Sequence, residues 1–183
     1  MNAPALIKVL TATSLASTAL LAAYALVVYE SLPERVAIDF DAAGRPTRYA
    51  PKPELLTILY LLIGVLASVT ALISVISVKR HAIVERYPYL VNLPALAILL
   101  GKLPEQIRRT YVDKIFVPLP AVGIVLNAGV FFPLVHILLE AAKTEYFTPL
   151  LLIAIVLTFA LSIAPAMILY YRKIYRELKA IVT

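Results

Sequence analysis

The sequence predicts an all-α integral membrane protein with four transmembrane helices and a small β-hairpin between the first two. Hydrophobic residues fill 62% of the chain and charged ones 15%, with a mean hydropathy of +0.90, all far from the averages of soluble domains. Four apolar runs, at 9–29, 55–78, 115–139 and 149–171, approach or exceed the roughly 20 residues that a helix needs to cross about 30 Å of hydrocarbon. We therefore treat the 183 residues as a single membrane domain.

The distribution of charge predicts the orientation of these helices. The connection 79–114 carries seven basic and three acidic residues, and the tail after Tyr171 carries four basic and one acidic. The segment 30–54, by contrast, has four basic and five acidic residues. Positively charged loops stay in the cytoplasm, so we expect an N-in/C-in, multi-pass protein of the cell membrane with an extracytoplasmic hairpin.

The basic inner surface predicts contact with lipid headgroups or with a cytoplasmic partner rather than with nucleic acid. Its charge follows the membrane topology, and anionic headgroups attract each well-placed basic side chain by about 1 kcal/mol. The residues that we assign to this surface are Lys79, Arg80, Arg108, Arg109 and Lys114.

The helices at 9–29 and 55–78 should form an antiparallel pair. Small residues recur four apart in the first helix, as Ser14 with Thr18 and Ala12 with Ala16, and such spacing lets helices pack closely in lipid. No Asp, Glu, Lys, Arg or His lies between 55 and 78. An ion pathway is expected to carry an intramembrane charge, so this helix does not favour a transporter.

The inner connection 79–114 contains an apolar run, 90–101, that is too short to span a membrane. We expect it to lie in the interface or to dip into the bundle, with Tyr87 and Tyr89 at headgroup level. A new helix should start at Pro104, because proline is favoured in the first turn.

The third helix, 115–139, contains Pro118, Pro120 and Pro133. Proline frees a backbone carbonyl that neighbours must satisfy in lipid, so we expect a kinked or broken helix inside the bundle. The fourth helix, 149–171, has aromatic and basic residues at its boundaries, as membrane helices usually do.

The polar segment 32–53 predicts the hairpin. Val36, Ile38 and Phe40 alternate with polar or small residues, which indicates a strand with one apolar face. Two strands alone are only marginally stable in water, so this face must lie on the flanking helices.

Asp41 and Gly44 occupy the first and fourth positions of a predicted turn. If Asp41 pairs with Pro46, Arg48 faces Asp39 and Thr47 faces Phe40. The first of these is an opposite-charge pair worth roughly 0.2–1 kcal/mol.

One candidate metal site follows from the topology. His136 and Glu140 lie four apart on one helical face, at the level where the hairpin presents Asp39 and Asp41. Imidazole and carboxylate groups suit Zn²⁺ or a similar ion. The same residues are also explained by a pair of Asp39 with Arg48, by a turn at Asp41, and by an interfacial hydrogen bond of His136.

Familiar catalytic signatures do not occur in the sequence: it has no HExxH, GxSxG, P-loop or GxGxxG motif. It also has no cysteine, which excludes thiolate metal sites and disulfides. We therefore expect a protein that is not an enzyme and needs no cofactor. Its poverty in thermolabile residues is typical of thermophiles.

The polar segment resembles the N-terminal domain of SdpI-like membrane proteins, which protect cells from a secreted sporulation-delaying peptide. The similarity covers about the first third of the chain and departs from the family at Ala37 and Asp39, where Pro and His are usual. It rests on Leu32, Pro33, Val36, Ile38, Phe40, Asp41, Gly44, Pro46 and Lys52.

This resemblance implies an outer hairpin with a sensing or immunity role. We expect it to bind a peptide or protein, while the basic inner loop carries any signal. The alternatives are a structural or accessory subunit of a larger membrane complex and, less favoured, the metal site. The residues that we assign to ligand or partner binding are Asp39, Phe40, Asp41, Arg45 and Arg48.

Overall fold

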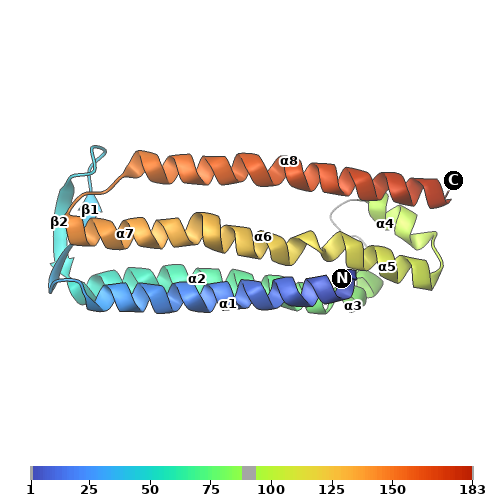
Figure 1. Ribbon diagram of the computed structural model, residues 1–183, viewed down its shortest axis with the longest axis horizontal. Coiled ribbons are helices and arrows are strands. Elements are labelled where there is room, and N and C mark those ends of the chain that lie inside the picture. Colours follow the sequence, from blue (N-terminus) through green and yellow to red (C-terminus); the bar gives the residue numbers. More distant parts are fainter. Residues whose placement is uncertain (1, 88–93, 183) are drawn as a thin grey trace.

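The computed structural model describes residues 2–87 and 94–182. Long helices run side by side, and a two-stranded hairpin covers one end of them (Figure 1). Both termini lie at the opposite end (Figure 1). We call these two ends the hairpin end and the termini end.

Four helical spans are long and apolar enough to cross a membrane, as the sequence predicts: Ala3–Glu30, Lys52–Val78, Glu105–Thr144 and Pro149–Val182. The first, second and fourth are the helices α1 (Ala3–Glu30), α2 (Lys52–Val78) and α8 (Pro149–Val182). The third joins four successive segments: α5 (Glu105–Phe116), α6 (Pro118–Leu126), the π-helical η2 (Asn127–Phe131) and α7 (Phe132–Thr144).

The third span begins at Glu105 rather than at 115, so the predicted inner helix and the predicted third membrane helix form one helical run. Pro118 and Pro133 lie in the first turns of α6 and α7, where a missing backbone N–H costs least. The helical run therefore changes its winding at these prolines and at η2 instead of ending there.

The termini end carries two short helices, α3 (Arg80–Arg86) and α4 (Pro94–Gly101). A buried cluster here joins Ile7 of α1, Leu100 of α4, Tyr111 of α5 and Leu178 of α8. Tyr87 is exposed, whereas Tyr89, the other predicted interfacial anchor, lies outside the described residues.

The helices α1 and α2 pack side by side as predicted, and one of the two small-residue pairs of α1 lies in a helix contact, which also involves α6. Ser14 and Thr18 are buried, while Ala12 and Ala16 are exposed. A Cβ on Gly123 would lie 2.6 Å from Ser14 Oγ, so the close approach of these helices requires glycine at this position.

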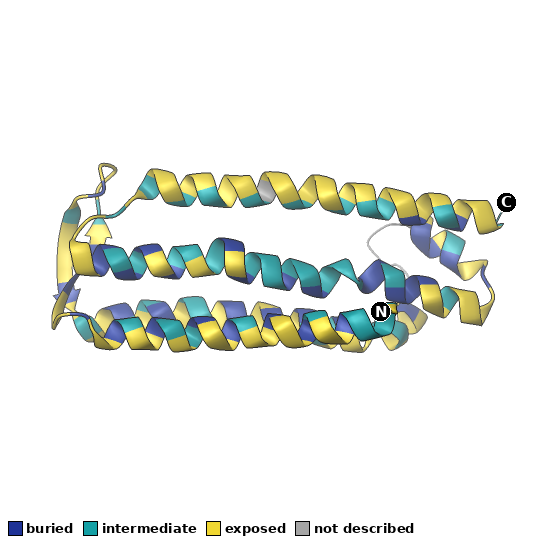
Figure 2. Cartoon of the chain, in the orientation of Figure 1, coloured by how far each residue is buried: buried dark blue, intermediate teal, exposed yellow. Residues whose placement is uncertain are grey.

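Helix α8 packs much less than the others. None of its 18-residue apolar window is buried, and Figure 2 shows exposed residues along most of its length. Near its middle, Phe159 lies against Gly129 of η2, where a Cβ would overlap the ring. Lipid or another protein must therefore cover most of α8 in a membrane.

Candidate functional site: the hairpin cap

The hairpin cap consists of β1 (Arg35–Phe40), β2 (Pro46–Pro51), the turn between them and the connection 145–148 between α7 and α8. Val36, Ile38 and Ala50 are buried in one cluster with residues of α1, α2 and α7, including Ala25 and Leu139. Burial of a Val or Ile side chain stabilises by about 1.5–3 kcal/mol. The helices therefore provide the apolar surface that the predicted hairpin needs.

Asp41 closes the turn as predicted. Its Oδ1 accepts hydrogen bonds from the backbone N–H groups of Ala43, at 2.8 Å, and Arg45, at 2.9 Å. The N–H of Gly44 donates to the carbonyl of Asp41 at 3.0 Å. The carboxylate of Asp41 is therefore occupied by two hydrogen bonds to the backbone of its own turn.

The predicted pairing of the strands is partly confirmed. Arg48 pairs with Asp39, but Phe40 pairs with Pro46 rather than with Thr47. The ladder shifts on both sides of Asp39. Ile38 is an extra residue on β1, and Thr47 is an extra residue on β2 next to the turn, where the N–H of Asp41 donates to the carbonyl of Arg45.

Arg48 forms an ion pair with Asp39 at 2.6 Å and with Glu54 of α2 at 3.2 Å. Its hydrogen bonds to Asp39 and then Glu54 raise the pKa of Arg48 above its ordinary value. All three side chains are about half exposed, so solvent screens both pairs and each contributes little to stability. The exposed side chain of Arg45 makes no ion pair within the described part of the chain.

The connection between α7 and α8 holds the tip of the hairpin. Phe147 donates its N–H to the carbonyl of Gly44 at 2.9 Å, and its ring stacks on Phe40 with centroids 5.4 Å apart. Tyr49 donates its hydroxyl proton to Glu145 at 2.8 Å, and this bond raises the pKa of Tyr49 above its ordinary value. The tip is therefore tied to the start of α8.

Lys52 ties the base of the hairpin to α1. Its ammonium donates to the carbonyls of Glu30 at 3.0 Å and Leu32 at 3.1 Å, and it lies 4.8 Å from the centroid of the Tyr29 ring. These carbonyls follow the end of α1, where a cation is favourable. Lys52 is one of the residues on which the resemblance to SdpI-like proteins rests, and in this structure it has a structural role.

The residues of the predicted metal site do not gather. No group of three His, Asp or Glu residues that suits a metal ion occurs in residues 2–87 and 94–182. His136 Nδ1 instead lies 2.6 Å from the hydroxyl of Tyr24, and its ring stacks on Phe132. Glu140 and Asp39 contribute no third ligand beside it, and metal binding stays a prediction.

The basic residues assigned to the inner surface lie at the termini end in different surroundings. Arg80 donates to the buried Asp113 at 2.6 Å, and Lys114 pairs with Glu177 of α8 at 3.1 Å. These two side chains therefore join helices within the bundle. Lys79 and Arg109 are exposed, and Arg108 is half-buried.

One polar cluster was not singled out by the sequence reasoning. Asn127, at the start of η2, is buried, and its Nδ2, with two hydrogens to donate, lies 3.1 Å from Ser14 O, 2.7 Å from Ser17 Oγ and 2.8 Å from Thr18 Oγ1. The hydroxyl of Thr18 also lies 3.1 Å from that of Thr70 on α2. An amide in an apolar helix rich in glycine and proline is the signal that indicates such a bond.

Comparison with known proteins finds a family match over the two strands of the hairpin cap. The family described as Domain of unknown function (DUF1648) matches residues 16–64, which comprise the second half of α1, the hairpin and the first half of α2. An uncharacterized protein of Archaeoglobus fulgidus is 36% identical over 122 residues, or 67% of this chain. The aligned region spans 64% of that protein. No solved structure matches the chain.

Together these observations describe a multi-pass membrane protein whose residues 16–64 match the DUF1648 family. The matched residues include most of the hairpin cap, and the connection 145–148 adds the rest. The site presents an ordered polar surface on an apolar base.

Proposed function

We propose that the protein acts in SdpI-like immunity or signalling, with the hairpin cap binding a peptide or protein outside the cell. The observation that carries this proposal is the link between the hairpin tip and α8. Phe147 bonds to Gly44 and stacks on Phe40, so a ligand on the tip acts directly on the least packed helix. Arg45, exposed and without an ion pair in the described residues, offers a charge to such a ligand.

A challenge experiment tests this function. Cells with and without the protein are exposed to a secreted sporulation-delaying peptide, and binding of that peptide to the purified protein is measured in parallel. We expect protection and binding for the natural chain and a loss of both for Arg45→Glu. Lys102→Gln, an exposed change at the termini end, is the matched control. Equal survival without the protein, together with no peptide binding, refutes the proposal.

The orientation that we propose places the hairpin end outside and both termini in the cytoplasm, as the charge distribution predicts. Because the chain has no cysteine, single introduced cysteines report the topology cleanly. Ala43→Cys should react with an impermeant maleimide in intact cells, whereas Lys102→Cys should react only after lysis. The reverse pattern would invert the orientation.

An accessory subunit of a larger membrane complex is the second candidate. The exposed apolar length of α8 favours it, as does an apolar cleft of about 440 Å³ between α6 and α8, lined by Val122 and Met167 among others. Purification in mild detergent decides this point. Recovery of the chain alone, with no stoichiometric partner, counts against a subunit role.

The metal site is a weaker alternative that only direct analysis decides. Metal content is measured in the purified natural protein and in His136→Ala. Metal in the natural chain that is lost in the variant supports the site, and equal or zero content in both removes it.

A further inference from the structure

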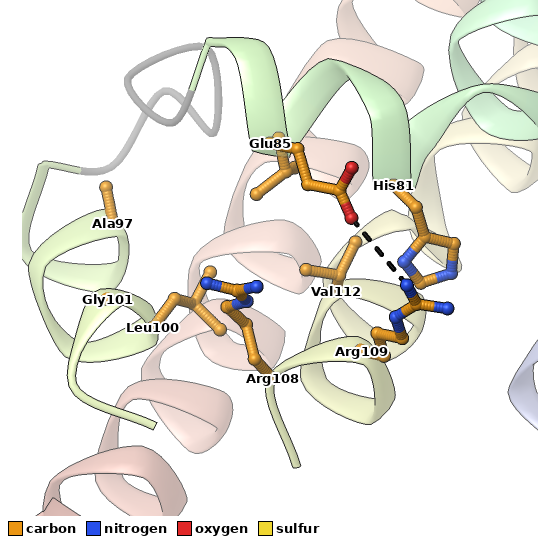
Figure 3. A pocket seen from close by; sticks show the side chains of 9 residues that line it. His81, Glu85, Ala97, Leu100, Gly101, Arg108, Arg109 and Val112 are labelled. Carbon is orange, nitrogen blue, oxygen red and sulfur yellow. Dashed lines mark ion pairs between the residues drawn. The ribbon is translucent and has the colours of Figure 1, made fainter. Parts of the chain in front are cut away.

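A cavity of about 210 Å³ lies at the termini end, enclosed by α3, α4 and α5. One wall is apolar and includes Val84, Leu100 and Val112, all three buried. The other wall carries charged and polar groups, with His81 and Glu85 on α3 and two arginines on α5 (Figure 3). The cavity therefore suits a ligand with a charged group next to an apolar one.

The two arginines of the lining differ in their partners. Arg109 pairs with Glu105 at 2.7 Å and approaches Glu85 at 4.0 Å, so its charge is largely matched. Arg108 is half-buried and has no ion pair within the described part of the chain. Figure 3 shows its guanidinium beside Leu100, between α5 and α4. The unmatched positive charge thus lies where the polar and apolar walls meet.

A buried network fixes the position of the polar wall. Asp113 of α5 accepts hydrogen bonds on one oxygen from Arg80 Nε at 2.6 Å and His81 Nε2 at 2.8 Å. Its side chain and that of Arg80 are each 11% exposed. This network attaches α3 to α5, and it holds His81 at the edge of the cavity.

The depth of the cavity matches lipid headgroups. The apolar helix α2 ends at Val78, and His81 follows three positions later, about 4.5 Å along a helix at 1.5 Å per residue. Headgroup phosphates lie just outside the hydrocarbon, at this level. Guanidinium groups bind phosphate oxygens through paired, charge-assisted hydrogen bonds.

We propose that this cavity binds a phosphate-bearing ligand through Arg108, with the apolar wall against the part of the ligand next to the phosphate. The headgroup of an anionic phospholipid fits this chemistry, and so does a soluble phosphate ester. The proposal is independent of any ligand at the hairpin cap, because the cavity lies at the opposite end of the bundle.

The test uses the full-length protein in a non-ionic detergent with three probes. Binding of dioctanoyl phosphatidylglycerol, dioctanoyl phosphatidylcholine and inorganic phosphate is measured by native mass spectrometry and by the shift in Tm. We expect the anionic lipid to bind about tenfold more tightly than the zwitterionic one. Arg108→Gln should weaken it about tenfold, because it removes a charge-assisted contact to the phosphate, and Arg108→Lys should retain most of it.

Arg35→Gln is the matched control, because Arg35 is exposed at the hairpin end and has no ion pair in the described residues. In one outcome, inorganic phosphate at millimolar concentration displaces the anionic lipid from the natural protein but has no effect on Arg108→Gln. That result would identify a soluble phosphate as the ligand of the same cavity. Unchanged binding of all three probes in Arg108→Gln overturns the proposal.

Discussion

Replacing Gly44 with alanine should detach the hairpin tip from the connection between α7 and α8. Gly44 has φ +80°, a conformation that side chains with a Cβ disfavour. A Cβ at this position would lie 1.9 Å from the backbone oxygen of Phe147. Because that obstacle is backbone rather than a flexible side chain, the connection itself has to move.

The magnitude follows from two contributions. A left-handed conformation costs an alanine roughly 1–2 kcal/mol, and displacing Phe147 removes a hydrogen bond worth about 0.5–1.5 kcal/mol. The contact should therefore weaken by about 2–3 kcal/mol. Gly64→Ala is the matched control, since a Cβ on Gly64 of α2 has nothing within 4 Å and alanine favours a helix by roughly 0.5–1 kcal/mol.

Hydrogen exchange at the amide of Phe147 measures this effect directly, because that N–H bonds to the carbonyl of Gly44. We expect exchange to accelerate about 30- to 100-fold in Gly44→Ala, at a factor of ten for each 1.4 kcal/mol, and to stay unchanged in Gly64→Ala. Equal protection in Gly44→Ala and in the natural chain would refute the contact between tip and connection.

Three further changes test other parts of the structure. Asn127→Leu should lower the free energy of unfolding in detergent by about 1–2 kcal/mol, the range of polar contacts between membrane helices, and an unchanged value would remove the role of this amide. Arg80→Met leaves the buried Asp113 with the bond from His81 but without its arginine partner and should cost up to about 3–5 kcal/mol, most of which a second change, Asp113→Leu, should restore. Tyr49 has its pKa raised from 10.0 by its bond to Glu145, so this contact is complete below pH 10 and is lost as pH rises through the raised pKa. Tyr49→Phe should abolish that alkaline step in hydrogen exchange of the connection.

The hairpin was predictable because local chemistry specifies it. Asp41 and Gly44 have few roles other than a turn, and the alternation of Val36 and Ile38 requires an apolar support. The exact pairing of the strands was not predictable. The sequence pattern favoured a pairing of Asp41 with Pro46, whereas in the structure the N–H of Asp41 bonds to the carbonyl of Arg45. A shift of this kind depends on the closed turn, which periodicity alone does not describe.

The partner of the hairpin tip could not be read from the sequence. Phe147 belongs to a connection more than a hundred positions away, and its sequence resembles an ordinary interfacial aromatic. The stack on Phe40 and the bond to Gly44 arise only when α7 and α8 meet the hairpin. The basic residues posed a similar problem, because net charge does not reveal that Arg80 pairs with the buried Asp113.

The loose packing of α8 makes it the helix that a movement of the hairpin cap can displace most easily. This helix meets the rest of the chain through the Phe147 connection at one end, through Phe159 on Gly129 near the middle, and through Tyr170 and Leu178 at the other end. None of its apolar window is buried between these contacts, so little packing opposes its displacement. A ligand that moves the hairpin tip therefore has a shorter mechanical path to α8 than to α1 and α2, which the apolar core holds together. Any signal from the cap should consequently appear first as a movement of the apolar part of α8 between the Phe147 connection and Tyr170.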